Sequence, residues 1–387
     1  MARLTRAQTQ ERTRAGVLAA ARDEFAERGF RAARIDAIAE RAGLTRGAVY
    51  SNFPGKRALY FAVLAELAER APGWTGPAPG QGRTAAEALG ALARTWVTRP
   101  SSAAADQGER AGAVAGDATA PRPGEARLSA DLIPEVTADE ALRRPYRQLL
   151  DLDALLVALA LEAMSPPTPS PGAPPRRSVR VAKTVLATLH GASRTAAAAP
   201  GFMEPYDVVS ACERLAGLEL SDWWAPPTGV RPARRADEPW EPPGAADLVR
   251  GEPASLAADG VVAFLGTHRL SAVEEAVRAA PPGTGITLVV VTGQPDELVP
   301  LTRLVVGELS RCLREAFPRS AWPGLRVVCD GPGAVAAAAG ITGADDRTEA
   351  AVRVGGGRVL YRATGPGACH AVASAAPARS GHAPTAG

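Results

Sequence analysis

The spacing of the apolar residues changes once along this 387-residue chain, near residue 245. Before that point, apolar residues recur every three or four positions, which is typical of amphipathic helices. After it, they gather in short runs rich in Val, Ile and Leu that alternate with helical stretches, which is typical of an α/β domain. We therefore expect an all-α N-terminal part followed by a smaller α/β domain.

Four helices are predicted at the N-terminus, over residues 9–28, 35–42, 45–52 and from 56 onward. Gly29 and Gly43 end the first two, because glycine readily adopts the left-handed conformation that follows a helix. Thr45 is a candidate N-cap for the third helix, and Pro54 separates the third helix from the fourth. Helices two and three would then be joined by a tight turn.

Further helices are predicted over residues 84–98, 127–164, 178–198 and 205–218. A loop rich in Gly and Pro covers residues 71–81. The segments 101–124 and 165–175 are dominated by Ala, Ser, Gly and Pro, so we expect them to be mobile insertions.

The α/β domain is predicted to have strands at 261–265, 286–291, 325–329, 350–354 and 359–363, with helices at 271–280, 295–317 and 333–340. Helices join the first three strands, which favours parallel pairing, whereas Gly355–Gly357 favours a hairpin between the last two. The expected division is a head at 1–55, a helical body at 56–224, a linker at 225–244, the α/β domain at 245–376 and a disordered tail at 377–387.

Positive charge is concentrated at the N-terminus. Residues 1–60 hold 12 Arg or Lys and 6 Asp or Glu, a net charge of +6, whereas the whole chain carries +3. Such a field attracts the phosphates of nucleic acid.

Several classes of protein are disfavoured by composition. The sequence has no run of about 18 uncharged apolar residues and no apolar signal-peptide core, so we expect a cytoplasmic protein without a membrane partner. The cysteines lie far apart without C-x-x-C spacing, so we expect no disulfide scaffold, metal site or cofactor. They are Cys212, Cys312, Cys329 and Cys369.

Two helices joined by a tight turn can place the second in the major groove of DNA. Arg46, at the exposed start of that helix, is the foremost candidate for base contacts, since arginine can donate two hydrogen bonds to guanine. Candidates for phosphate contacts are Arg34, Thr45, Tyr50 and Lys56. The alternative is a pair of core helices in an α-bundle, with Arg46 and Lys56 as solvated surface charges.

The run G-L-T-R-G-A-V-Y-S-N-F-P-G-K-R-A-L, from Gly43 to Leu59, closely resembles the signature of the TetR/AcrR family of transcription regulators. Other residues also fall on the family's pattern, namely Phe25, Gly29, Ile35, Ile38, Ala39 and Ala42. In the family pattern Tyr50 and Lys56 contact phosphates. The residues that line the groove are Thr45, Arg46, Gly47, Ala48 and Ser51. Ala33 and Arg34 stand where family members often carry a hydroxyl cap.

The resemblance also implies a helical body that binds a small-molecule effector and forms a homodimer on a double-stranded DNA operator. Helices at 178–198 and 208–218 would pack against their mates in a four-helix interface. Candidate pocket residues are Trp96, Tyr146, His190 and Phe202, because aromatic and His side chains in an Ala- and Leu-rich bundle can orient a ligand. The alternative is that these four are ordinary core residues.

The order of elements after residue 245 resembles a thioredoxin-like fold. A redox member would carry a reactive cysteine after the first strand, where this chain has Thr267–Leu270. Cys369 and His370 are adjacent, but neighbours on a helix point about 100° apart and rarely act on each other. The segment G-P-G-A-V-A after Asp330 lacks a full phosphate-binding fingerprint.

We therefore expect a ligand-responsive repressor, not an enzyme, that binds a pseudo-palindromic operator. Its α/β domain would serve sensing or contact, or be an unrelated α/β domain. The main alternative is a regulator–enzyme fusion whose α/β domain catalyses a redox or other reaction. Sequence does not separate a repressor from an activator.

Overall fold

The computed structural model describes residues 5–70, 82–98, 128, 131–164, 177–222 and 224–375. The chain divides into two compact units. The helical unit comprises Met1–Trp223, Leu248–Arg250 and Gln294–Pro323, and the sheet unit comprises Trp224–Asp247, Gly251–Gly293 and Gly324–Gly387.

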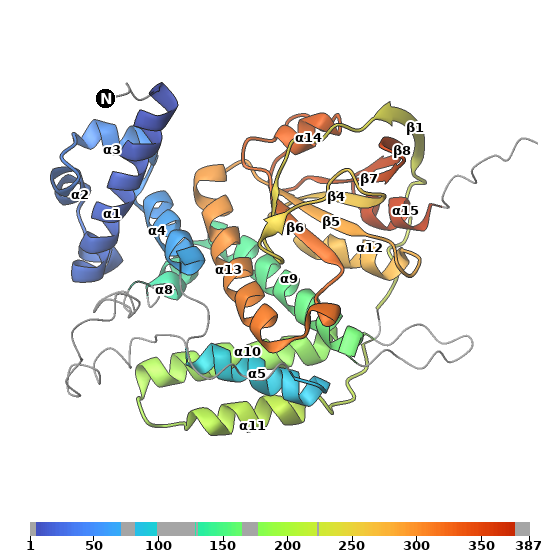
Figure 1. Ribbon diagram of the computed structural model, residues 1–387, viewed down its shortest axis with the longest axis horizontal. Helices are drawn as coiled ribbons and strands as arrows, with labels where there is room; N and C mark the ends of the chain where they lie inside the picture. Colours follow the sequence, from blue (N-terminus) through green and yellow to red (C-terminus); the bar gives the residue numbers. More distant parts are fainter. Residues whose placement is uncertain are drawn as a thin grey trace, which may run out of the picture. The chain divides into compact units, whose positions relative to one another are not determined.

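The helices of the helical unit include α1 Arg6–Ala32, α2 Ile35–Arg41, α3 Arg46–Asn52, α4 Lys56–Arg70, α5 Ala85–Val97, α8 Leu132–Ala138, α9 Glu140–Met164, α10 Val179–Ala198, α11 Pro205–Leu215 and α13 Pro295–Ala316 (Figure 1). The helical N-terminal part is therefore as predicted. Within the helix predicted over 127–164, α8 and α9 are separate helices, because Asp139 between them is extended, with φ −117° and ψ 114°.

The first helix begins with a capping box, in which Thr5 and Gln8 each accept a hydrogen bond from the other's backbone N–H. Gly29 breaks the helix at φ +72°, as its position indicated, and one more turn follows to Ala32. Around the break, the ring of Tyr60 from α4 lies edge-on to Phe25 at 5.5 Å and 4.7 Å from the ring of Phe30. These aromatic contacts bind α4 to α1.

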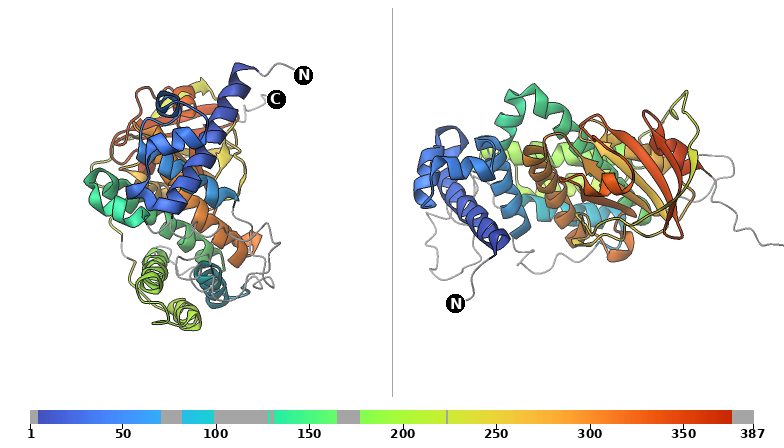
Figure 2. Two further views of the ribbon diagram at one scale, coloured as in Figure 1. Left: turned by 90° about the vertical axis from the view of Figure 1, so that its left-hand side faces the viewer. Right: turned by 90° about the horizontal axis from the view of Figure 1, so that it is seen from above.

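Helix α13 belongs to the helical unit, although it lies between two strands of the sheet unit in sequence. It packs against α4, α5 and α9 and lies beside α4 in each view (Figures 1 and 2). This division differs from the predicted α/β domain at 245–376. The apolar stripe of α13 predicts a helix that must be covered, but such a stripe does not specify which part of the chain covers it.

The sheet unit has strands β1 Arg234–Pro239, β2 Ala246–Asp247, β3 Glu252–Pro253, β4 Gly260–Gly266, β5 Ile286–Val291, β6 Leu325–Cys329, β7 Glu349–Gly355 and β8 Arg358–Thr364. Six of them form one mixed sheet in the order β1-β8-β7-β4-β5-β6. As predicted, β4, β5 and β6 are parallel, and β7 and β8 form an antiparallel hairpin. Gly356 and Gly357 turn that hairpin with φ values of +58° and +72°.

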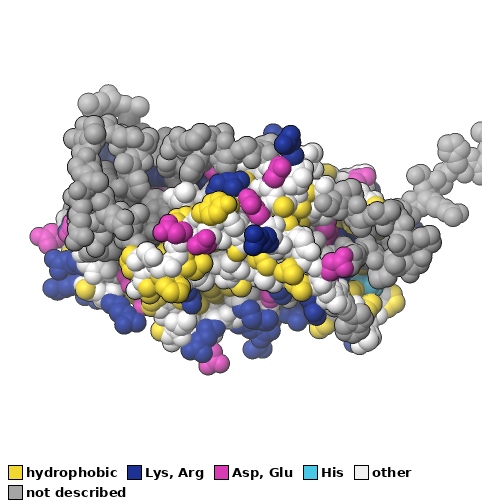
Figure 3. Space-filling view, turned by 90° about the horizontal axis from the view of Figure 1, so that it is seen from below, with side chains coloured by type: hydrophobic (Ala, Val, Ile, Leu, Met, Phe, Trp, Pro, Cys, Tyr) yellow, Lys and Arg dark blue, Asp and Glu magenta, His cyan; other side chains and the backbone are white. Residues whose placement is uncertain are grey.

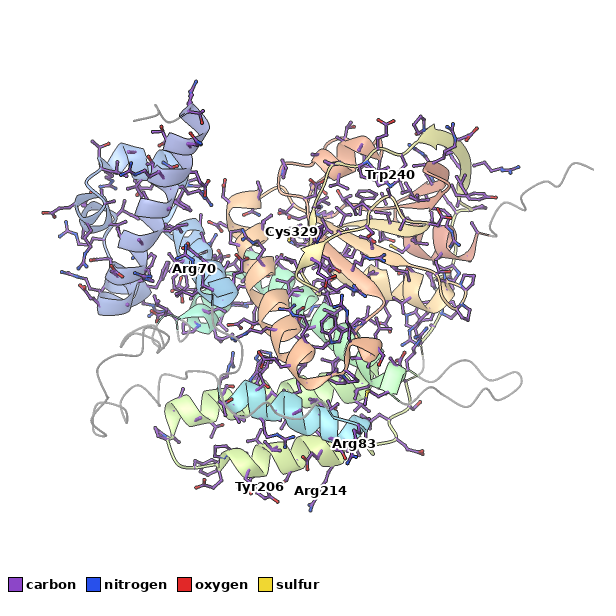
Figure 4. All side chains as sticks on the ribbon, in the orientation of Figure 1. Arg70, Arg83, Tyr206, Arg214, Trp240 and Cys329 are labelled. Carbon is purple, nitrogen blue, oxygen red and sulfur yellow. The ribbon has the colours of Figure 1, made fainter. Side chains whose placement is uncertain are left out.

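Helices cover both faces of the sheet. Helices α12 (Val273–Ala279) and α15 (Ala368–Ser374) pack together on one face. The other face is an apolar layer that includes Phe264 and Val352, covered by α14 (Ala334–Ala338) and Trp240. Trp240 is labelled in Figure 4. Its indole donates a hydrogen bond to the carbonyl of Leu256 at 2.8 Å.

The segment 225–244, which its Pro and Arg repeats indicated as a linker, includes strand β1. This strand pairs with β8 at the edge of the sheet, and five of its six side chains are exposed. Strands are predicted from alternating apolar residues, but an exposed, charged edge strand lacks that pattern. Its pairing through the backbone could therefore not be predicted from the sequence. The segment predicted as a linker therefore contains an edge strand of the sheet unit.

Other predictions lie outside the described residues, namely the loop 71–81, the insertions 101–124 and 165–175, and the tail 377–387. Among the described helices, none is long and apolar enough to span a membrane.

Candidate nucleic-acid interface

Helices α2 and α3 form a helix-turn-helix. Gly43 takes φ +65° in the turn, where an L side chain would be strained. Thr45 caps α3 as predicted, since its hydroxyl oxygen accepts a hydrogen bond from the backbone N–H of Ala48 at 3.2 Å. The two helices are fixed by buried Ile35, Ile38 and Val49.

Most of α3 faces solvent. Val49 is its buried residue, whereas Arg46, Gly47, Tyr50 and Ser51 are exposed. Arg46 and Tyr50 are one turn apart, and the guanidinium carbon lies 5.5 Å from the centre of the phenol ring. The structure thus brings the predicted groove residues together on one exposed helix of a positively charged domain.

Asp36, in the first turn of α2, lies between two of the predicted DNA contacts. Its carboxylate is 3.4 Å from Arg46 Nη1 and 3.8 Å from Arg34 Nη2. All three side chains are at least half exposed, so the pairs are weak in free energy but orient both guanidinium groups. Sequence reasoning did not single out Asp36.

Lys56 has a structural partner. Its ammonium donates a hydrogen bond to the carbonyl of Arg31 at 3.0 Å and lies 4.8 Å from the ring centre of Phe30. Partial burial lowers the pKa of Lys56, while Glu135 and Glu24 act in the opposite direction. An ammonium has three donors, so a phosphate contact remains compatible with this bond.

Two further residues hold the helix-turn-helix in place. Arg14 donates to the carbonyl of Asn52 at 3.1 Å, and its guanidinium stacks 4.2 Å from the ring centre of Phe53. Buried Glu24 accepts a hydrogen bond from the backbone N–H of Arg34, the N-cap residue of α2, at 3.3 Å. Both partners are distant from their targets in sequence, 38 and 10 positions away, so no local pattern indicated them.

Three of the four predicted pocket residues lie within the helical bundle. The Trp96 indole donates to Ser193 Oγ at 3.0 Å, and its ring centre is 5.0 Å from that of His190. Burial raises the pKa of Tyr146 to about 12, with Asp153 and Glu308 acting in the same direction. Phe202 is separate from them and lies 73% exposed between α10 and α11.

Asp153 was not anticipated. It is 2% exposed on α9, and burial raises its pKa well above its ordinary value, with Glu308 on α13 acting in the same direction. An isolated aspartate gives no sign of burial in sequence, since most are solvated.

In the sheet unit, the Cys369 thiol is fully buried, and burial raises its pKa. A nucleophilic cysteine needs the opposite shift. After β4, Arg269 pairs with Glu349, whose carboxylate also accepts from the backbone N–H groups of Gly367 and Ala368. The thioredoxin-like interpretation remains a prediction.

These features define a helix-turn-helix DNA-binding domain. Residues 17–63 match the family model described as bacterial regulatory proteins, tetR family. The chain is 48% identical over 65 residues to the HTH-type transcriptional regulator SrpR of Pseudomonas putida, and 48% identical over 65 residues to the uncharacterized HTH-type transcriptional regulator TtgW of the same species. Each match covers 17% of this chain, and they cover 30% of SrpR and 48% of TtgW. The chain is also 42% identical over 55 residues to the HTH-type transcriptional activator FasR of Mycolicibacterium smegmatis. This match covers 14% of this chain and 25% of FasR.

Two solved structures are also similar. A transcriptional regulator from Rhodococcus sp. Rha1 is 21% identical and matches 53% of this chain and 94% of its own, with a TM-score of 0.33. A TetR transcriptional regulator from Rhodococcus sp. RHA1 is 17% identical and matches 54% and 95%, with a TM-score of 0.30. The N-terminal domain of the chain is therefore similar to the DNA-binding domain of TetR-family transcription regulators. Its match spans less than half the length of the curated relatives.

Proposed function

We propose that the protein is a ligand-responsive transcription repressor that binds a pseudo-palindromic operator as a homodimer in the cytoplasm. The observation that carries this proposal is the exposed, capped start of α3, which presents Arg46 beside small Gly47 on a positively charged domain. A helix end with a long donor and a small neighbour suits close approach to base edges.

Two sets of contacts follow from this arrangement. Arg46, Gly47, Ala48 and Ser51 would face the bases, with Arg46 donating to a guanine. The phosphate contacts would come from Arg34, Thr45, Tyr50 and Lys56. Phosphate contacts fix the register of the domain on DNA, whereas base contacts select the sequence.

The dimer would form through α10 and α11. The exposed large hydrophobic side chains of the described residues include Phe202, Met203 and Tyr206 at the start of α11, with Tyr206 77% exposed. Figure 3, seen from the side of α11, shows hydrophobic side chains between charged ones, and Figure 4 shows Tyr206 and Arg214 pointing away from the bundle. Phe202 suits this interface better than an effector pocket.

The effector would bind among Trp96, Tyr146 and His190 in the helical bundle. The indole, phenol and imidazole groups offer aromatic surface and hydrogen bonds at once, which suits a ligand of mixed polarity. The sheet unit would serve sensing or contact, and its buried Cys369 thiol, whose pKa burial raises, is unsuited to act as a nucleophile.

The test is a titration of the full chain against the DNA upstream of its own gene, at two salt concentrations, with a scrambled duplex as competitor. Saturable, sequence-selective and salt-sensitive binding is expected. Equal affinity for both duplexes, there and in a selection from random sequences, would refute the proposal. Reporter expression in a deletion strain separates a repressor, whose loss raises expression, from an activator.

A further inference from the structure

Helix α13 is continuous in sequence with the sheet unit at both ends. It begins at Pro295, shortly after β5 ends at Val291, and it is followed by β6 from Leu325. It packs mainly against α4, α5 and α9 of the helical unit. The side chains that it buries include Leu298, Leu301, Thr302, Leu304, Val305, Leu309 and Leu313.

Ion pairs fasten α13 to both ends of α4. In the first turn of α4, Arg57 Nε donates to Glu297 Oε2 at 2.7 Å, and the same guanidinium also pairs with Asp139. In the last turn, Glu69 accepts two hydrogen bonds from Arg303, at 2.8 and 2.7 Å. The hydrogen bond from Arg57 also lowers the pKa of Asp139.

Helix α4 is in turn a rigid continuation of the DNA-binding domain. It follows α3 after the three residues Phe53–Gly55, and Phe53 is buried. Tyr60 is fully buried against Phe25 and Phe30 of α1. Whatever fixes the direction of α4 therefore fixes the direction of the recognition helix.

The sheet unit anchors the residues that lead into α13. Thr292 donates its hydroxyl hydrogen to Asp346 Oδ1 at 2.5 Å, and Thr267 donates to the same oxygen at 2.8 Å. These threonines directly follow β5 and β4, at the carboxyl ends of parallel strands, which is the edge where open α/β sheets commonly take ligands. Only Gly293 and Gln294 separate this anchor from the start of α13.

We infer that Glu297 and Arg303 are positioning residues for operator binding, through which α13 sets the direction of α4 and so of the recognition helix. This inference rests on the proposed function, because it assumes that a dimer binds two half-sites. Half-sites are separated by about one helical turn of DNA, roughly 34 Å, so the two recognition helices must be held at a fixed spacing. If α4 is less firmly fixed, ordering it to reach both half-sites costs more entropy, so specific binding weakens. Non-specific contact with phosphates does not need the two helices at a fixed spacing and is not weakened in this way.

The experiment uses the full chain and, as probes, the tightest duplex it selects from a random library and a scrambled version of that duplex. The variants are Arg303→Glu, Glu69→Arg and the double swap, which restores an ion pair in reverse. Each single variant is expected to bind the selected duplex roughly threefold to tenfold more weakly, since like charges then face each other. The double swap is expected to bind the selected duplex within about twofold of the wild-type affinity. On the scrambled duplex we expect neither the loss of affinity in the single variants nor its recovery in the double swap.

The two single variants change the charge of the protein in opposite directions. A simple effect of charge on DNA affinity would therefore have opposite signs in Arg303→Glu and Glu69→Arg, whereas loss of positioning weakens both. Equal and opposite changes would overturn the inference.

The control is the pair of Arg358 and Asp237, which joins β8 to β1 in the sheet unit and belongs neither to α4 nor to the proposed dimer helices. Its side chains are 44% and 78% exposed, against 44% and 42% for Arg303 and Glu69. Arg358→Glu and Asp237→Arg are expected to leave the affinity within about twofold. Losses equal to those at Arg303 would mean that any reversed surface ion pair weakens binding, and would overturn the inference.

Amide hydrogen exchange without DNA gives an independent readout. Exchange in residues 46–60 is expected to rise in both single variants and to return in the double swap. If no selective duplex exists, the proposed function fails and exchange alone decides the positioning role. If a selective duplex exists but the single variants bind it like the wild type, or exchange is unchanged, the positioning role itself is wrong.

Discussion

The DNA-binding domain and the helical body are both all-α, but they are completed in different ways. The helix-turn-helix is built from contiguous sequence, and its cap, its turn and the contacts from Arg14 and Glu24 that hold it join residues of the first 63 positions. The body takes its long helix α13 from a segment more than 130 residues beyond α9 in sequence. A similarity to known proteins in the N-terminal domain therefore does not show which segments of the chain complete the core of the helical body.

The largest expected effect tests whether the body needs α13. A chain ending at residue 222 loses this helix and exposes the apolar faces of α4, α5 and α9. The seven buried Leu and Val side chains of α13, at about 1.5 to 3 kcal/mol each, amount to on the order of 10 to 20 kcal/mol, comparable to the whole stability of a domain. We expect this chain to aggregate or to lose the cooperative unfolding of its body in a denaturant titration followed by circular dichroism.

A point variant tests the same idea without truncation. In the full chain, Leu309→Ala removes a fully buried side chain of α13 and should cost about 2 to 5 kcal/mol of unfolding free energy. A soluble 1–222 chain that unfolds like the full protein would show that the body is complete without α13.

The difference between the locally built DNA-binding domain and the body completed by a distant helix also explains which features could be predicted from the sequence. Gly29, Gly43 and the Thr45 cap act on residues within a few positions, so the boundaries of the first three helices were predictable within one turn. The parallel strands and the hairpin were likewise predicted, because each is a short β-branched run with a clear boundary.

Features that depend on distant partners were not predictable. The edge strand β1 exposes its side chains, so it has no apolar pattern. The stripe of α13 does not encode its partner, and the burial of Asp153 follows from helices that meet only in the folded chain. In the candidate interface, the exposed residues were identified, but Asp36, Arg14 and Glu24, which orient them, were not.

Within the DNA-binding domain, the next largest effect should separate base contacts from phosphate contacts. Arg46→Ala is expected to cost about 1 to 3 kcal/mol on the selected duplex and to relax base preference at one position per half-site. The matched variant Lys56→Ala should weaken binding to all duplexes and lower the salt slope by about one unit for each phosphate that the protein no longer neutralises. Fluorescence anisotropy at several salt concentrations measures both, and identical behaviour of the two variants would contradict the assigned roles.

The sheet unit should show a pH dependence that the DNA-binding domain does not share. Burial and the neighbouring Glu349 raise the pKa of Glu275 from 4.5 to about 7, while Arg269 opposes this shift. Between these values the folded chain binds more protons than the unfolded chain, so this contribution to stability is complete below about pH 4.5 and is lost as the pH rises through 7.

In the wild type the stability of the sheet unit should fall between about pH 5 and about pH 8, and Glu275→Gln should reduce this fall. The measurement is the urea midpoint of unfolding at each of the two pH values. The control is Glu274→Gln on the same helix, whose carboxylate pairs with Arg278 at 2.6 Å. If both variants change the pH profile alike, helix charge rather than the buried carboxyl of Glu275 is responsible.

The smallest expected effect concerns Asp36, and it tests whether the DNA-binding domain orients its own reading residues. Asp36→Asn removes the charge that holds Arg34 and Arg46, a pair of weak surface interactions. Affinity for the scrambled duplex should rise, because a negative charge near the phosphates is lost, whereas selectivity should fall by about twofold to fivefold. The control is Glu27→Gln, which removes an equal charge from a similarly exposed residue paired with Arg41, away from α3. If Asp36→Asn raises both affinities by the same factor, Asp36 only repels DNA, and the orientation of Arg46 is then set by its contact with Tyr50.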